Sequence, residues 1–183
     1  MNPICDHHVD CCVFSTRLGW MAVARSPNGV LGITLPARTA ESALDRLCEK
    51  TRTPPNVMHE MAESAFGTLP ARLSAFIHGH RTDFPDSIDR RGWTGFRSRV
   101  WEATRHIPYG ETRSYGWVAA AAGQPMAFRA TGQALHHNPV PIIIPCHRVV
   151  GSRGSLTGFG SGLELKAILL ALESKSVVSS ANL

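Results

Sequence analysis

The chain has 183 residues, of which 43% are hydrophobic and 18% charged, with a formal net charge of +5. This size allows one large core or two small domains. No basic start followed by an apolar stretch is present, so we expect no secretory signal, and no apolar run is long enough to cross a bilayer. The five cysteines are odd in number and lack framework-like spacing, which predicts reduced thiols rather than disulfides.

The excess of basic residues lies in the second half of the chain. Residues 1–96 contain ten Lys or Arg and ten Asp or Glu, whereas residues 97–183 contain nine basic and four acidic residues. A basic half joined to a neutral half indicates a polyanionic partner such as nucleic acid. A solvated basic face explains the charge equally well, so individual residues must decide between the two.

Residues 1–90 predict an α/β domain. Its β-prone runs are separated by turn residues, and Asn28-Gly29 between two of them favours a hairpin. A helix is expected over Thr39–Lys50, because Thr39 can cap it and apolar residues recur at helical spacing. Residues 51–56 are expected to form a loop and residues 70–77 a short helix. The strand-like runs are Val13-Phe14, Trp20–Ala24 and Val30–Leu35.

Residues 91–173 predict a mainly helical domain, which follows a polar, turn-rich linker at 78–95. Apolar spacing predicts one helix over Phe96–Ile107. A final amphipathic helix is expected over Leu163–Glu173. The serine-rich residues 174–183 are expected to form a mobile tail.

Two short helices separated by a tight turn are expected in the middle of this domain. Ser114 can cap the first, which runs through Val118–Ala122, and Gly123-Gln124-Pro125 ends it. The second covers Met126–His137 and ends at Asn138-Pro139. This pattern in a basic region is typical of a DNA-binding helix-turn-helix, although many enzymes contain such a pair incidentally.

The ten residues Ile142–Gly151, with the sequence IIIPCHRVVG, carry the most chemical information. The apolar run predicts a buried strand that ends at Pro145, directly before Cys146. A lone cysteine is more often a small buried hydrophobe than a nucleophile. A thiol at the edge of a core element, followed at once by histidine and arginine, is instead typical of a reactive cysteine, whose nucleophilic form is the thiolate.

His147 is the nearest base to Cys146 in the sequence, but neighbouring residues of an extended segment point to opposite faces. Proton transfer between them is therefore expected to need a bridging water and a group that orients the imidazole. Glu173 on the last helix is the best carboxylate for this purpose. The alternative interpretation is that Glu173 faces solvent at the end of its helix.

The segment after the cysteine is rich in glycine, with five glycines between residues 151 and 162 around Phe159. Glycines let a backbone approach a ligand closely, and the aromatic ring offers a surface for a flat base. No phosphate-loop pattern is present, because the lysine that follows, Lys166, lies inside a predicted helix.

Three segments together closely resemble the O6-alkylguanine-DNA alkyltransferases, also called methylated-DNA–protein-cysteine methyltransferases. They are YGETRSYGWVA, RATGQALHHNPVPIIIPCHRVVG and GSLTGFGSGLELKAILLALE. The resemblance covers about residues 90–173. It implies a helix-turn-helix and an active-site loop in a mainly α C-terminal domain, and a ribonuclease-H-like α/β domain in the N-terminal half.

The resemblance implies DNA repair by direct, irreversible and stoichiometric transfer of a methyl or other alkyl group. Cys146 would accept the group from guanine O6, and less efficiently from thymine O4. His147 would act on Cys146 through a water, and Glu173 would hold the histidine. Asn138 would support the turn that carries the active-site segment. Tyr115 would press on the DNA and help to protonate the departing guanine.

The resemblance also implies how DNA and the damaged base are bound. The base must leave the stack to reach a protein thiol, and Arg129 would enter from the minor groove to fill the gap. The residues implied in DNA contact, besides Arg129, are Ser114, Tyr115, Ala127, Ala130 and Gly132. Those implied in the guanine pocket are Val149, Phe159 and Gly160.

No cofactor is expected, and the expected partner is double-stranded DNA that carries O6-alkylguanine. We expect a monomer with no obligatory protein partner and no membrane association, located in the cytoplasm, or in the nucleus of a eukaryote. Several N-terminal residues resemble metal ligands, but their spacing fits no standard zinc motif, so no metal is predicted. These residues are Cys5, His7, His8, Cys11 and Cys12.

Two other classes of function are weighed against repair. A lesion-sensing binding protein would flip the base without repairing it, but relatives of that kind lack the cysteine that this chain has at Cys146. A cysteine hydrolase using Cys146 and His147 would leave the basic helix-turn-helix without a purpose.

Overall fold

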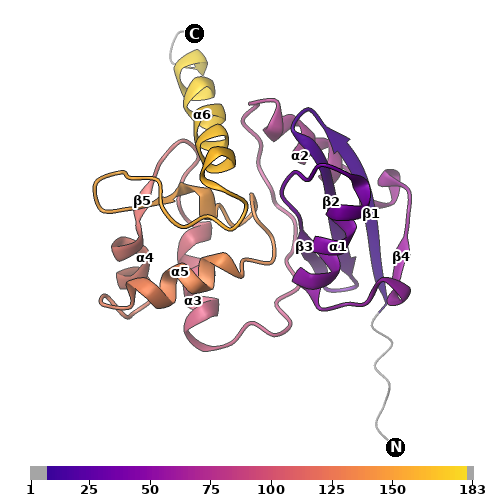
Figure 1. Ribbon diagram of the computed structural model, residues 1–183, viewed down its shortest axis with the longest axis horizontal. Helices are drawn as coiled ribbons and strands as arrows, with labels where there is room; N and C mark the ends of the chain where they lie inside the picture. Colours follow the sequence, from indigo (N-terminus) through magenta and orange to yellow (C-terminus); the bar gives the residue numbers. More distant parts are fainter. Residues whose placement is uncertain (1–7, 181–183) are drawn as a thin grey trace, which may run out of the picture. The chain divides into compact units, whose positions relative to one another are not determined.

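The computed structural model describes the backbone of residues 8–180 and the side chains of residues 8–174 (Figure 1). The chain divides into two compact units. The first comprises the residues up to 71 together with 85–90, and the second comprises 72–84 together with the residues from 91 onward. Sequence analysis placed 72–84 in the first domain. This was wrong because Phe76 packs edge-on against the rings of Tyr109 and His147, both of which belong to the second unit.

The first unit contains a mixed four-stranded sheet. Its strands are β1 (Val9–Thr16), β2 (Gly19–Ser26), β3 (Gly29–Ile33) and β4 (Met58–Glu60). They lie in the order β3-β2-β1-β4, with β1 and β3 antiparallel to β2 and with β4 parallel to β1. The predicted hairpins are confirmed. Gly19 and Gly29 open β2 and β3 with φ values of +126° and +131°, which L side chains rarely adopt.

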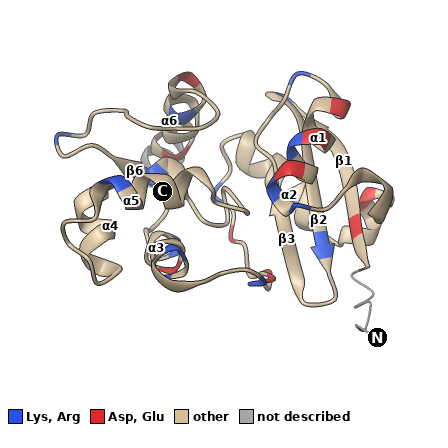
Figure 2. Cartoon of the chain, turned by 60° about the horizontal axis from the view of Figure 1, so that its bottom comes forward, with Lys and Arg blue, Asp and Glu red and all other residues tan. Residues whose placement is uncertain are grey.

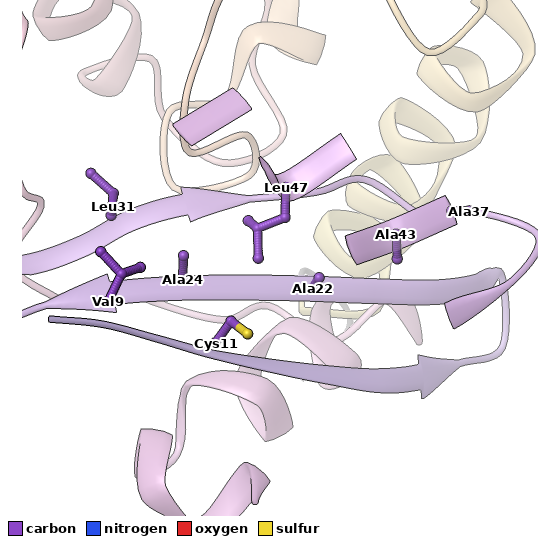
Figure 3. Packing of buried hydrophobic residues seen from close by; sticks show 8 residues of the cluster. All are labelled: Val9, Cys11, Ala22, Ala24, Leu31, Ala37, Ala43 and Leu47. Carbon is purple, nitrogen blue, oxygen red and sulfur yellow. The ribbon is translucent and has the colours of Figure 1, made fainter. Parts of the chain in front are cut away.

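One helix, α1 (Ala40–Thr51), packs against this sheet. The predicted cap is confirmed, because the Thr39 hydroxyl accepts from Ser42 N–H and the Ser42 hydroxyl accepts from Thr39 N–H in a reciprocal capping box. Figure 3 shows Ala43 and Leu47 among the side chains of the sheet. The cluster consists of Val9, Cys11, Ala22, Ala24, Leu31, Ala37, Ala43 and Leu47.

Residues 85–90 return to the first unit and are held by hydrogen bonds. Val30 N–H donates to Ser87 O, and Asp89 N–H donates to Val30 O. The Ser26 hydroxyl also donates to the buried Asp89 carboxylate at 2.5 Å. Part of the predicted linker is therefore built into the domain before the chain leaves it. Two short 3-10 turns complete the unit, η1 (Pro55–Val57) and η2 (Glu63–Phe66).

The second unit is mainly helical. Its helices are α3 (Gly95–Arg105), α4 (Tyr115–Ala121), α5 (Phe128–His136) and α6 (Leu163–Ser180), together with most of α2 (Leu69–Ile77). The predicted helices are thus confirmed within a few residues except for the end of the last one, and the predicted Ser114 cap accepts from Trp117 N–H. Two short parallel strands pair across the unit, β5 (Arg113–Ser114) and β6 (Val149–Val150). Among residues 8–180, no helix combines the length and apolar character needed to span a bilayer.

Two predictions for this unit were wrong. The apolar residues 142–144 form a tight turn instead of a strand, in which Ile144 N–H donates to Val140 O and Ile142 has a φ of +77°. Prolines on both sides of the run remove backbone donors that a strand would use. The last helix continues to Ser180, so the predicted tail starts as helix. Residues 181–183 of that tail lie outside the described part of the chain.

Candidate active site

Cys146 begins a single 3-10 turn, η3 (Cys146–Arg148), and does not lie on an extended segment as expected. Its N–H donates to Ile144 O at 2.8 Å, which ties the turn to the preceding loop. A 3-10 helix has three residues per turn, so consecutive side chains point about 120° apart. Cys146 can therefore face the core of the unit, where it is 7% exposed, while the next two side chains reach other partners.

His147 and Glu173 meet in the interior of the second unit. His147 Nε2 lies 2.7 Å from Glu173 Oε1, and each residue is 1% exposed. The Phe76 ring packs edge-on against the imidazole, with the ring centroids 5.9 Å apart. The structure therefore brings together the histidine and the carboxylate named from the sequence. The alternative in which Glu173 faces solvent is wrong.

Arg148 holds the same carboxylate, a role that sequence analysis missed. Its Nε lies 3.1 and 3.0 Å from the two Glu173 oxygens, and its Nη2 lies 2.9 Å from Oε1. Its Nη1 donates to Ile107 O at 2.6 Å, and Gly110 N–H donates to Glu173 Oε2 at 2.9 Å. The carboxylate thus accepts hydrogen bonds from three residues, which fixes its orientation toward His147.

These contacts set the charges of the site. Burial lowers the pKa of His147 below its ordinary value of 6.5, in spite of the nearby carboxylate, so the imidazole is neutral at neutral pH. Burial acts to raise the pKa of Glu173, but the hydrogen bonds and charges of His147 and Arg148 outweigh it and bring that pKa to about 2. Because Glu173 is an acceptor, Nε2 of the neutral His147 carries the proton. Nδ1 is then the basic nitrogen.

Asn138 connects helix α5 to the loop that carries the cysteine. Its side-chain amide donates to Ile144 O at 2.8 Å, and its side-chain oxygen accepts from Val140 N–H at 3.1 Å. Asn138, Val140 and Ile144 are all buried, so water cannot reach the two backbone groups. Without the Asn138 side chain, Val140 N–H and Ile144 O would lose these hydrogen bonds without replacement. Asn138 thus contacts the backbone of the loop before Cys146 at two points.

Tyr115 lies beside the reactive segment because β5 pairs with β6, which places Ser114 opposite Val150. The Tyr115 hydroxyl lies 3.0 Å from both Thr157 O and Gly158 O in the glycine-rich loop. Burial raises the pKa of Tyr115, and the nearby Cys146 acts in the same direction. The tyrosine therefore connects the start of α4 to the loop expected to line the base pocket.

Lys166 is the second residue that sequence analysis missed. It is fully buried, and its Nζ donates to Val149 O at 2.6 Å and to Thr157 O at 2.9 Å. The ammonium also lies 5.7 Å from the Tyr115 ring centroid and 5.8 Å from that of Phe159. The sequence contained a signal for this position. Lys166 and Glu173 are seven residues apart on one helix and share a face with the buried Leu169.

The residues named for DNA contact on α5 and just before it are exposed or half-buried. Arg129 and Ala130 are exposed on α5, and Ala127 and Gly132 are half-buried. An ideal Cβ on Gly132 would lie 3.9 Å from Tyr115 Cε1, so α5 passes close to this tyrosine. The pocket candidates differ in exposure, since Val149 is buried, Phe159 half-buried and Gly160 exposed.

The N-terminal Cys and His residues can be assessed only in part. Cys5 and His7 lie outside the described residues, whereas Cys11 and Cys12 are buried in β1. Burial raises the pKa of Cys11 to about 11 and that of Cys12 to about 12. Within the described residues, no group of three or more His, Cys, Asp or Glu side chains is placed to hold a metal ion.

The geometry defines a protein with a buried cysteine, an oriented histidine and carboxylate, and an exposed helix that carries arginine. A family model for the DNA-binding domain of 6-O-methylguanine DNA methyltransferase matches residues 95–175. A methylated-DNA–protein-cysteine methyltransferase of Mycolicibacterium paratuberculosis is 45% identical over 148 residues, which cover 81% of this chain and 88% of that protein. The corresponding protein of Mycobacterium bovis is 47% identical over 128 residues, covering 70% and 77%.

The solved structures agree with these relatives. Mycobacterium tuberculosis OGT in complex with DNA matches with a TM-score of 0.76 and 35% identity, over 91% of this chain and 94% of that one. The chain therefore belongs to the methylated-DNA–protein-cysteine methyltransferase family.

Proposed function

We propose that this chain repairs DNA by moving an alkyl group from guanine O6 to Cys146, once and irreversibly. The observation that carries the proposal is the buried contact of 2.7 Å between His147 and Glu173, one residue along the chain from a buried cysteine. Membership of the family supplies the reaction type. O6-alkylguanine is the preferred lesion in this proposal, and O4-alkylthymine is a poorer substrate.

The reaction is a displacement at the alkyl carbon. The Cys146 proton passes through a water to Nδ1 of His147, whose imidazolium is stabilised by the Glu173 carboxylate. The sulfur attacks the alkyl carbon as the carbon–oxygen bond breaks, so a thioether forms and guanine leaves with the electron pair. Tyr115 helps to protonate the departing guanine. A thioether is not hydrolysed, so the protein acts once.

The damaged base reaches the sulfur by leaving the helical stack. Within a duplex the O6 carbon is out of reach of a protein thiol, so flipping is required. In this proposal α4 and α5 act as a helix-turn-helix, with α5 at the minor groove and Arg129 filling the gap. Ser114, Ala127, Ala130 and Gly132 contact the backbone there. Val149, Phe159 and Gly160 line the pocket.

The remaining expectations complete the proposal. The mixed sheet and α1 of the first unit fit a small ribonuclease-H-like domain. We expect the protein to act as a monomer in the cytoplasm, without an obligatory protein partner or a cofactor.

Intact-mass measurement after incubation with an O6-methylguanine duplex tests the proposal. The expected result is one added methyl group per protein, lost in Cys146→Ser and kept in Cys48→Ser, a matched change at a half-buried cysteine of the first unit. DNA binding without a mass change would support a lesion sensor and contradict repair. Repeated turnover of an ester or amide that depends on Cys146 would support a hydrolase instead.

A further inference from the structure

Two large apolar side chains are exposed at the start of α5 and just before it. They are Met126 and Phe128, two of the seven exposed large apolar side chains among the described residues. Met126 is 82% exposed and Phe128 45% exposed, and they flank Arg129 closely in sequence. Single exposed apolar side chains are common on protein surfaces, but neighbouring ones can mark a binding surface.

Phe128 is held in place by a glycine on the neighbouring helix. An ideal Cβ on Gly116 would lie 3.3 Å from Phe128 Cε1, tighter than most real contacts. A side chain at position 116 would therefore shift the ring by a few tenths of an ångström, so the ring packs directly against the Gly116 backbone. The pairing of Gly116 with Phe128 fixes the ring over the first turn of α4, next to Tyr115, while nearly half of it remains exposed.

This position lies on the side of the unit that reaches the reactive cysteine. Tyr115 packs against the core cluster that contains Cys146. An ideal Cβ built on Gly132 of α5 would lie 3.9 Å from Tyr115 Cε1. A nucleotide that delivers its base to Cys146 must therefore be attached to a duplex that runs near Tyr115 and the start of α5. Figure 2 shows basic positions in blue on α3 and α5, in a half of the chain with nine basic and four acidic residues.

We propose that Phe128 and Met126 form an apolar wedge that packs into the minor groove of duplex DNA beside Arg129. The inference rests on the proposed function and adds to it a second kind of contact. Proteins that open the minor groove commonly insert phenylalanine or methionine at a base step, because the apolar surface covers what unstacking exposes. Arg129 supplies a charged contact with the DNA. The wedge supplies an uncharged contact with sugars and base edges.

The two kinds of contact differ in their response to salt. Each cation–phosphate contact releases counterions and adds close to one unit to the slope of log affinity against log salt. An apolar contact adds affinity without changing that slope. The variants Phe128→Ala and Met126→Ala, alone and combined, should therefore weaken duplex binding while the slope stays as in the parent protein.

The test measures affinity for an O6-methylguanine duplex by fluorescence anisotropy at several salt concentrations. We expect Phe128→Ala to lose about tenfold in affinity at every salt concentration, and Phe128→Leu to recover most of it. The control Met61→Ala removes a side chain that is 43% exposed in the first unit and should bind as the parent does. Far-UV circular dichroism and melting temperature show whether each variant is folded.

Several outcomes would overturn the inference. The wedge is refuted if Phe128→Ala binds the duplex as tightly as the parent. It is also refuted if the loss of affinity is accompanied by a smaller slope of log affinity against log salt. A change confined to self-association of the DNA-free protein in sedimentation would make this surface a contact between copies instead. Failure of the parent protein to take up a methyl group refutes the proposed function, whereas uptake by the parent with full binding by Phe128→Ala refutes the wedge alone.

Discussion

Replacing Glu173 by glutamine tests the electrostatic account of the site. The pKa of this carboxyl falls from its ordinary value of 4.5 to about 2 in the native state, which corresponds to about 3 kcal/mol of stabilisation at neutral pH. Breaking a buried ion pair by removing one partner typically costs about 3–5 kcal/mol, because the other charge stays buried without compensation. Here that partner is Arg148, which is 9% exposed. Both arguments predict that Glu173→Gln lowers the free energy of unfolding by about 3 kcal/mol at pH 7.

The pH dependence gives the sharper result. The pKa of Glu173 is depressed in the native state. The contribution of this carboxylate to the free energy of unfolding is therefore complete above about pH 4.5 and is lost as the pH falls towards 2. The difference in unfolding free energy between the parent and Glu173→Gln should therefore shrink over this range, by at most about 1.4 kcal/mol per pH unit. Urea denaturation at pH 7, 5, 4 and 3 measures it. A difference below 1 kcal/mol at pH 7, or one that stays constant into acid, would refute the reasoning.

Two further substitutions test buried polar groups of the second unit. Thr131 is fully buried on α5 and its hydroxyl has no hydrogen-bond partner among the described residues, so Thr131→Val should stabilise the protein by about 1 kcal/mol and raise the melting temperature by about 2–4 °C. An unchanged or lower melting temperature would contradict this. Asn138→Ala deprives Val140 N–H and Ile144 O of their side-chain partner. It should lower the free energy of unfolding, measured by urea denaturation, by about 3 kcal/mol. A cost below 1 kcal/mol would show that the turn holds without it.

Local sequence patterns predicted most of the secondary structure. The Asn28-Gly29 turn, the Thr39 cap and the Ser114 cap depend on neighbouring residues only, and all three occur in the structure. The run before Cys146 was mispredicted for a different reason. Apolar β-branched residues favour a strand, but Asn138, six residues before Ile144, binds the backbone of this segment and closes it into a turn. Contacts of that kind override local preference.

Residue chemistry alone singled out Cys146 and the adjacent His147, and left Glu173 as one of two interpretations. The role of Glu173 as the partner of His147 came from the family resemblance. Arg148 was overlooked because an arginine is usually exposed, and no local pattern predicts its burial against Glu173. Lys166 was overlooked because a lysine in a helix is usually solvated, and its full burial depends on acceptors from two other segments.

Lys166 gives a prediction that separates electrostatics from architecture. Burial lowers the pKa of its ammonium, and the charge of Cys146 acts in the opposite direction, so the same interaction favours negative charge on the sulfur. Lys166→Met keeps the length of the side chain but removes the charge. We expect its reaction with the free base O6-benzylguanine to be slower at neutral pH and its rate profile to move to higher pH.

The matched control for Lys166→Met is Arg153→Met, which removes an exposed charge from the glycine-rich segment and should leave the profile in place. Single-turnover rates between pH 5 and 9 provide the comparison. If Lys166 only ties Val149 O to Thr157 O, its loss should lower the rate by the same factor at every pH. A uniform loss would therefore reject an electrostatic contribution and leave Lys166 as a structural link. A displaced profile would show that the buried ammonium acts on the sulfur, because a misplaced loop does not discriminate between protonation states.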